Sequence, residues 1–375
     1  MIRPEERRYR PVIEHPTADS AASPASILFL DKVLAGPCLR PPRGVELFNL
    51  NLLGGLARRG YPVTALVHPD WHPRIRAAAG DFPITLVSPP VAEGANLPRA
   101  WLIRAAAGRR ADILLLANVA NRLIPSLLLL RWLRAARRCV LIAHREPSRR
   151  VLWAQKAWPS SIIAVNRTIA GQFQRRGFAR TSVYYGITNA DRFFPAPPRP
   201  DDGLIHFCVA GSLDNAWKGS DTAVEAFRRM PPDRRRISRL HLASFRQPPE
   251  FSDPRIIAYP WIPAEEMPEF FRRMDVMIVP SRDQGMMMET FSQVMVQGML
   301  SGLPIIATRL PILTEKLDAG GGVIVDDAAG LASAMVRLAA DPAERRRMGA
   351  EARSTAQKRY VWDTDLFARR YLRLL

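Results

Sequence analysis

The feature that most constrains the fold is a regular alternation of short apolar runs with stretches of helical spacing. Apolar runs at residues 27–30 and 61–67 flank a helical stretch at 45–60, where Gly60 stands in the position of a helix C-cap. A strand, a helix and a strand in this order form a βαβ unit with a right-handed crossover. Ligands of such units bind at the carboxyl ends of the strands.

The same pattern continues through both halves of the chain. Further strands are expected at residues 84–87, 112–117, 139–143, 162–165, 182–185, 205–210, 240–243, 256–258, 276–279, 304–307 and 322–325. An Arg-rich amphipathic helix is expected to reach Arg138. This pattern predicts an α/β fold of two Rossmann-like, doubly wound domains that face each other across a cleft.

A proline-rich stretch separates the two halves. Residues 193–203 hold four prolines in eleven positions, which disfavours both helix and strand. We therefore expect a flexible lead-in at 1–25, a first domain at 26–198 and a second at 199–361. The terminal helix, about 362–375, is expected to pack back on the first domain.

The positive charge lies in the first half. Residues 1–200 carry 30 Lys and Arg against 12 Asp and Glu, whereas the remainder carries 24 against 23. An anionic partner such as a phospholipid surface, a pyrophosphate-bearing substrate or nucleic acid would explain this asymmetry. Coding bias explains the excess of Arg over Lys, but it does not explain why one half alone is basic.

The cysteines and the hydropathy indicate the compartment. Cys38, Cys139 and Cys208 are widely spaced and form no CxxC pair, which argues against a disulfide framework or a cysteine zinc site. The charged N-terminus does not resemble a signal peptide, and we expect no apolar run long enough to cross a bilayer. The predicted location is the cytoplasm.

The segment at residues 280–308 carries the most specific signal. Glu289 precedes a predicted helix near Phe291, so backbone N–H groups of Ser292 and Gln293 are expected to be free for a phosphate. Gln293 and Gln297 share one face of this helix, which is apolar nearly all round. The spacing alone is equally compatible with a buried helix that carries a hydrogen-bonded core glutamine and a capping glutamate.

These residues resemble the signature of the retaining GT-B glycosyltransferases of family 4. In that signature two glutamates, separated by seven residues, precede a Gly-x-Pro strand, and Glu289, Phe291, Gly302 and Pro304 match it. The resemblance implies that Glu289 contacts the transferred sugar. Gln297 occupies the place of the second glutamate, whose role is to bind ribose, and it retains one hydrogen-bonding oxygen.

A second segment is similar to the Gly-Arg-loop-Lys-Gly element of the same family. Gly211 matches its first glycine, and Lys218 matches the lysine that holds the donor pyrophosphate. Ser212 replaces the usual arginine, and Arg282 and Arg246 are the candidates to supply its charge.

In the first domain, Arg43 and Gly44 resemble the Gly-Gly loop that approaches the donor phosphates. His144 follows a predicted strand where the family has a His facing the cleft, although a histidine at a strand end is more often structural. Tyr185 stands where the family usually has a donor-facing Asn. No metal-binding motif is visible, so neither a metal nor another cofactor is expected.

The resemblance implies a metal-independent, retaining hexosyltransferase that moves a sugar from a nucleotide-sugar donor to a glycan. A lipid-linked or anionic acceptor in cell-surface polysaccharide or glycolipid synthesis fits the basic first half, as does peripheral binding to the inner face of the membrane. Two alternatives stay open: a GT-B protein that has lost catalysis, and a basic protein that binds membrane surfaces or nucleic acid. No recognisable nucleic-acid-binding motif supports the nucleic-acid alternative.

Overall fold

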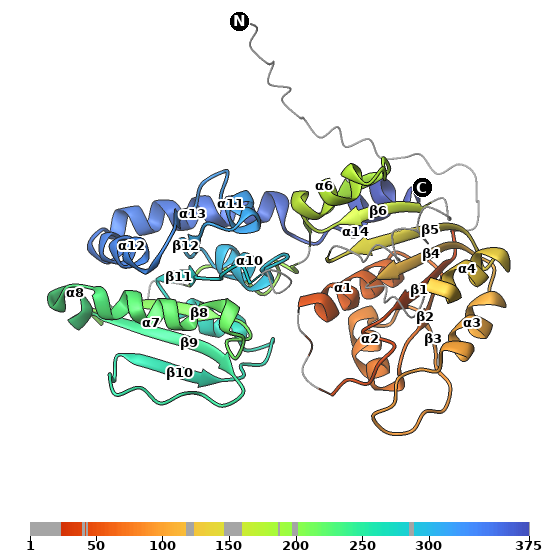
Figure 1. Cartoon of the computed structure of the whole chain (residues 1–375), viewed down its shortest axis with the longest axis horizontal. Helices are drawn as coiled ribbons and strands as arrows, with labels where there is room; N and C mark the ends of the chain where they lie inside the picture. The colour runs from red at the N-terminus through yellow and green to blue at the C-terminus, as the bar shows by residue number, and fades with distance from the viewer. Residues whose placement is uncertain are drawn as a thin grey trace, which may run out of the picture.

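The computed structural model describes residues 24–39, 42, 44–117, 124–145, 160–186, 188–196, 202–284 and 289–374. Within these residues the chain forms two parallel α/β sheets that lie side by side (Figure 1). The expected α/β class with two doubly wound sheets is therefore confirmed, and every strand expected from the sequence is present.

The N-terminal sheet has seven strands in the order β3-β2-β1-β4-β5-β6-β7, and all of its strand pairs are parallel. The strands are β1 (Ile27–Asp31), β2 (Val63–Leu66), β3 (Thr85–Val87), β4 (Ala111–Ala117), β5 (Ala136–Ala143), β6 (Ser160–Ala164) and β7 (Thr181–Val183). The helices are α1 (Gly44–Arg58), α2 (His72–Ala79), α3 (Arg99–Ala107), α4 (Ile124–Trp132) and α6 (Arg167–Arg175). Side chains of β1 and β4 are almost completely buried, as expected for central strands of a parallel sheet.

The C-terminal sheet has six parallel strands in the order β10-β9-β8-β11-β12-β13. The strands are β8 (Ile205–Ala210), β9 (Ser238–Phe245), β10 (Ile256–Pro260), β11 (Val276–Val279), β12 (Ile305–Thr308) and β13 (Gly322–Val325). The helices are α7 (Ser220–Arg229), α8 (Pro232–Arg236), α9 (Met267–Arg272), α10 (Gln293–Leu300), α11 (Pro311–Lys316), α12 (Ala328–Ala340) and α13 (Pro342–Arg359).

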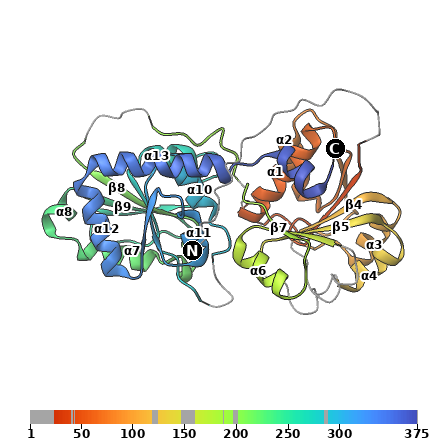
Figure 2. The same ribbon diagram turned by 90° about the horizontal axis from the view of Figure 1, so that it is seen from above.

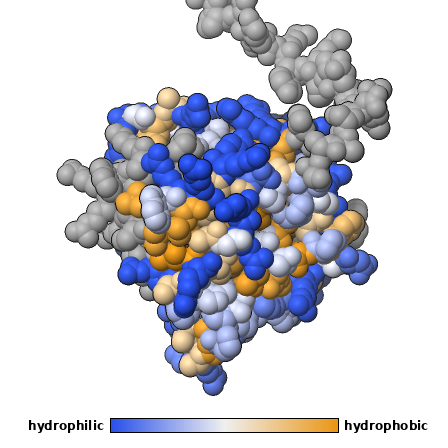
Figure 3. Space-filling view, turned by 90° about the vertical axis from the view of Figure 1, so that its right-hand side faces the viewer, coloured by the Kyte–Doolittle hydropathy of each residue, from blue (hydrophilic) through white to orange (hydrophobic). Residues whose placement is uncertain are grey.

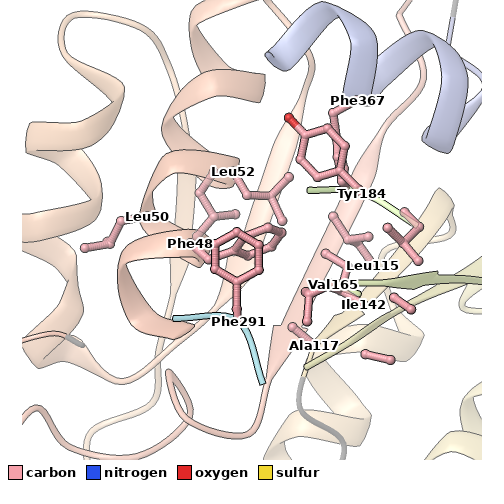
Figure 4. Packing of buried hydrophobic residues seen from close by; sticks show 14 of the residues in the cluster. Phe48, Leu50, Leu52, Leu115, Ala117, Ile142, Val165, Tyr184, Phe291 and Phe367 are labelled. Atoms are coloured by element: carbon pink, nitrogen blue, oxygen red, sulfur yellow. The ribbon is translucent and has the colours of Figure 1, made fainter. Parts of the chain in front are cut away.

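The end of the chain returns to the N-terminal domain. Helix α13 leads into α14 (Thr364–Leu366) and a π-helix (Phe367–Leu372), and Figure 2 shows the C-terminus beside α1 and α2. The ring of Tyr184 contacts Trp362, Phe367 and Tyr371 edge-on, at centroid distances of 5.4, 4.9 and 5.1 Å. One buried apolar cluster therefore runs from the N-terminal domain into the terminal segment, and Phe291 of the C-terminal domain belongs to it together with Phe48 (Figure 4).

The expectation of a helix that reaches Arg138 was wrong. Helix α4 ends at Trp132, and Arg134 adopts a left-handed conformation with φ of 51° that turns the chain into β5. Arg137 and Arg138 therefore belong to a strand, and the Arg138 guanidinium donates a hydrogen bond to the carbonyl of Leu372. A left-handed arginine carries no clear signal in the sequence, since this position is usually glycine or asparagine.

In the part of the chain that the structure describes, no helix combines the length and the apolar character that crossing a bilayer requires.

Candidate active site

A cavity of about 480 Å³ lies between the two domains and collects the residues predicted from the sequence. It is lined by Gly44, His144, Gly211, Lys218, Glu289, Phe291, Ser292, Gln293 and Gln297. Arg43 lies outside the described residues. A larger cavity, of about 950 Å³, is lined by residues of α1, the end of α13 and the segment around Tyr185, and none of the nine residues above lines it. The predicted site residues that the structure describes therefore gather at the smaller cavity.

Lys218 and Glu289 form an ion pair in this cavity. The Nζ of Lys218 lies 2.5 Å from Oε2 of Glu289, and the two side chains are only 12% and 7% exposed. The ammonium also lies 4.4 Å from the centre of the Trp217 ring, and the Ser281 hydroxyl donates a hydrogen bond of 3.4 Å to the same Glu289 oxygen. Two opposite charges shielded from water at this distance attract each other strongly. The two residues with separate predicted roles are thus each other's partner in this structure.

A tight turn after β8 places Lys218. The chain passes through Gly211, with φ of 129°, and a short 3₁₀ helix (Ala216–Lys218) to Gly219, with φ of 71°. A Cβ atom at Gly219 would lie 2.0 Å from the carbonyl oxygen of Pro280, so only glycine fits there. The residue that follows the carboxyl end of β11 is therefore in direct contact with the Lys218 turn.

Arg282 holds this turn from outside the cavity. Its backbone N–H donates to the Trp217 carbonyl at 2.7 Å, and its guanidinium donates to the Ala216 carbonyl and to Asp221. Neither Arg282 nor Arg246 lines the cavity. In this structure, therefore, the Arg282 guanidinium is bonded to the Lys218 turn and does not face the cavity wall at Ser212.

Glu289 also fixes the start of α10. Its Oε1 accepts a hydrogen bond of 3.0 Å from the backbone N–H of Ser292, which is the N-cap residue and adopts a left-handed conformation with φ of 57°. We had expected the Ser292 N–H to be free for a phosphate, but it is bonded to Glu289. Among the described residues, the Ser292 hydroxyl and Oε1 of Gln293 have no hydrogen-bond partner although both are buried. Unpaired polar atoms of this kind at a helix N-terminus favour a polar ligand.

The N-terminal domain contributes a second helix N-terminus. Helix α1 begins at Gly44, and a Cβ atom there would lie 3.3 Å from Oε1 of Gln293. The first turns of α1 and α10 therefore meet at the same cavity, and each presents the positive end of a helix dipole to it.

His144 lies at the carboxyl end of β5 and is 6% exposed. Its ring packs edge-on against Phe48 at a centroid distance of 4.9 Å, and its Nε2 has no hydrogen-bond partner among the described residues. Burial, with a smaller contribution from Arg145, lowers the pKa of His144 to about 4. The imidazole is consequently neutral at pH 7.

Two further residues lie where the sequence did not predict them. Asn166 of the N-terminal domain donates a hydrogen bond of 2.6 Å to the carbonyl of Thr290, next to Glu289. Its position before a helix predicts a capping role, but no local sequence pattern predicts its hydrogen bond to a residue of the other domain. Tyr185, expected to face the donor, lines the larger cavity instead and donates a hydrogen bond to Glu315.

No group of three or more His, Cys, Asp or Glu side chains suited to a metal ion occurs within the described ranges.

Comparisons with known proteins agree with this architecture. Residues 205–341 match the family model described as glycosyl transferases group 1. No curated protein matches the sequence.

Solved structures resemble the whole chain at low sequence identity. HepE from Anabaena, in complex with UDP and glucose, is 16% identical with a TM-score of 0.69, and the match covers 93% of this chain and 98% of HepE. A glycosyltransferase from Rickettsia africae is 14% identical with a TM-score of 0.71, over 94% and 98% of the two chains. WaaG, described as a glycosyltransferase involved in lipopolysaccharide biosynthesis, is 14% identical with a TM-score of 0.63, over 92% and 98%. The chain therefore has the GT-B fold, and most of its C-terminal domain matches the group 1 glycosyl transferases.

Proposed function

We propose that the protein is a glycosyltransferase that takes a hexose from a nucleotide sugar and transfers it with retention and without a metal. The observation that carries this proposal is the meeting of Lys218, Glu289 and the N-termini of α1 and α10 in one cavity between the domains. The match of residues 205–341 to the group 1 glycosyl transferases supports it. HepE, which shares the fold, is described in complex with UDP and glucose.

The leaving group of such a reaction is a nucleoside diphosphate, which gains negative charge as the sugar departs. The Lys218 ammonium and the two helix N-termini lie where they can stabilise that charge. Because their orientation is fixed by the fold, they need little rearrangement during the reaction. In this proposal these groups provide the electrostatic stabilisation in place of a metal ion.

Binding of the donor requires Lys218 to change partner. The ammonium now pairs with Glu289, and a pyrophosphate would compete with the carboxylate for it. Glu289, released from Lys218 but still bonded to the Ser292 N–H, then has Oε2 available for a sugar hydroxyl. Neutral His144 can form a hydrogen bond with another hydroxyl through Nε2. Gln297 lines the same cavity, and its proposed partner is the ribose.

The acceptor is proposed to be a lipid-linked or anionic glycan, brought to the N-terminal domain by peripheral binding to an anionic membrane. The end of α4 exposes Trp132 by 78%, with Leu129 and Leu133 exposed by 38% and 36%, and the neighbouring Arg131 and Arg134 are exposed as well. Figure 3 shows apolar patches among hydrophilic side chains on the face at this end of the molecule. An exposed tryptophan beside arginines suits an interface with anionic lipid.

A thermal-shift screen with UDP, GDP, ADP and their sugars tests the proposal. At least one nucleoside diphosphate should raise the Tm of the wild-type protein, because a ligand that binds only the folded state stabilises it. Lys218→Ala should abolish most of that shift, whereas Lys358→Ala, on the wall of the larger cavity, should leave it unchanged. A wild-type protein that responds to none of the nucleotides, or a shift lost only in Lys358→Ala, would contradict the proposed function.

A further inference from the structure

We propose that Asn166, from the N-terminal domain, is a positioning residue for Glu289 in the C-terminal domain. The role of Glu289 in this statement rests on the proposed function. The hydrogen bonds that Asn166 makes do not depend on that function.

Asn166 makes two hydrogen bonds with opposite ends of one amide group. Its Oδ1 accepts from the backbone N–H of Ile169 at 2.7 Å and thereby caps helix α6. Its Nδ2 donates to the carbonyl of Thr290 at 2.6 Å. The side chain is buried, with 3% of its surface exposed, so water does not compete for either bond. A single side chain therefore caps a helix in one domain and holds the backbone next to Glu289 in the other.

The turn that Asn166 holds is strained. Ser292 is not glycine, yet it adopts φ of 57°, a conformation that costs about 1 kcal/mol or more and persists only where the surroundings enforce it. The same turn sets the Glu289 carboxylate, because Oε1 accepts from the Ser292 N–H. The position of the carboxylate is thus coupled to the backbone at Thr290 and Ser292.

A second set of contacts supports the same turn through α11. The guanidinium of Arg167, the residue after Asn166, lies 3.6 Å from Glu315. The next residue on α11, Lys316, places its ammonium 3.6 Å from the centre of the Phe291 ring. The start of α6 therefore contacts both the Glu289 turn and the helix that supports Phe291.

Residues of both domains therefore hold the turn that carries Glu289. A rigid-body separation of the domains would break the Asn166–Thr290 bond and the Arg167–Glu315 pair together. The turn would then lose one of the bonds that hold its left-handed residue. Contact between the two domains at α6 therefore helps to hold Glu289 in its present orientation.

The variant Asn166→Asp separates the two roles of the side chain. It has the same shape and keeps the oxygen that caps α6, but it replaces the amide donor by an oxygen that faces the Thr290 carbonyl. Asn166→Ser is the second variant, because serine also caps helices but is too short to reach Thr290.

Hydrogen exchange at single amides is the first measurement, since it does not depend on activity. In both variants the Ser292 amide should exchange about tenfold faster, which corresponds to the loss of about one hydrogen bond. The Ile169 amide, which reports the α6 cap, should keep its wild-type rate. An unchanged Ser292 rate, or equally faster exchange at Ile169, would overturn the proposal.

Kinetics of transfer, or of donor hydrolysis, provide the second measurement. We expect kcat to fall about tenfold, whereas the Kd for the nucleoside diphosphate should rise by no more than about threefold, because Lys218 and α1 are untouched and only the start of α10 is loosened. A loss of nucleotide binding that matches the loss of kcat would indicate a merely structural role and would overturn the proposal. If the wild-type protein binds no nucleotide, the proposed function fails, and the exchange rate at Ser292 still decides the role of Asn166.

Discussion

Replacement of Lys316 by methionine should stabilise the protein at neutral pH. The Lys316 side chain is fully buried, and its Nζ has no hydrogen-bond partner within the described residues. Its Nζ lies 3.6 and 4.8 Å from the centres of the Phe291 and Tyr360 rings. Burial lowers the pKa of Lys316 from 10.5 to about 7, against the opposing effect of Glu315 and Glu289.

The magnitude follows from the difference between the two pKa values. A drop from 10.5 to about 7 corresponds, at about 1.4 kcal/mol per pH unit, to a cost of about 5 kcal/mol for the folded state at neutral pH. This figure is the net effect of the site on the ammonium, ring contacts included, and repacking around a side chain of nearly the same volume costs up to about 1.5 kcal/mol. Lys316→Met should therefore gain about 3 kcal/mol at pH 7.

The gain should depend on pH in a defined direction. Between about pH 7 and 10.5 the unfolded chain keeps the Lys316 proton that the folded chain loses, so the stability of the wild-type protein rises with pH in this window. The advantage of the methionine variant is therefore largest at or below pH 7 and shrinks toward pH 10.5. Urea denaturation of both proteins at pH 7 and pH 9.5 measures this difference. A variant that is less stable at pH 7, or a gap that does not shrink at pH 9.5, would refute the reasoning.

Three further predictions concern other parts of the molecule. Gly219→Ala should lower the free energy of unfolding by about 3 kcal/mol or more, measured by urea denaturation, because its Cβ would meet the Pro280 carbonyl and its φ is 71°. His144→Gln should flatten the pH dependence of stability below pH 6.5. As the pH falls from 6.5 to about 4, the unfolded wild-type histidine takes up a proton that the folded one excludes. The wild-type protein therefore loses up to about 3 kcal/mol of stability in this window. Trp132→Ser should leave the Tm unchanged, because this side chain is 78% exposed. It should reduce sedimentation with anionic vesicles at low salt. Equal sedimentation of variant and wild type would contradict a role of α4 in membrane binding.

The strands were predictable because they are short apolar runs between helical stretches, and a parallel sheet buries its central strands on both faces. The runs at 205–210, 276–279 and 322–325 coincide with β8, β11 and β13. The end of α4 was not predictable, because its helical pattern of leucines and arginines continues past the left-handed Arg134.

Several residues that line the cavity could be predicted from the sequence, but the hydrogen bonds and ion pairs between them could not. The resemblance to a family brought Lys218 and Glu289 to one site, and nine of the predicted residues line one cavity, whereas Tyr185, Arg246 and Arg282 do not. The pairing of Lys218 with Glu289, and of Glu289 with the Ser292 N–H, depends on side-chain orientations that spacing does not encode. The contact from Asn166 depends on how two domains meet, and residues 124 positions apart carry no local signal of it.

A crystal structure of the protein with the nucleoside diphosphate that stabilises it most tests the central claim most directly. The pyrophosphate is expected in the cavity of about 480 Å³, with Lys218 turned from Glu289 to a phosphate oxygen and the N-termini of α1 and α10 facing it. A pyrophosphate bound in the larger cavity, or one bound while the Lys218–Glu289 pair stays intact, would contradict it.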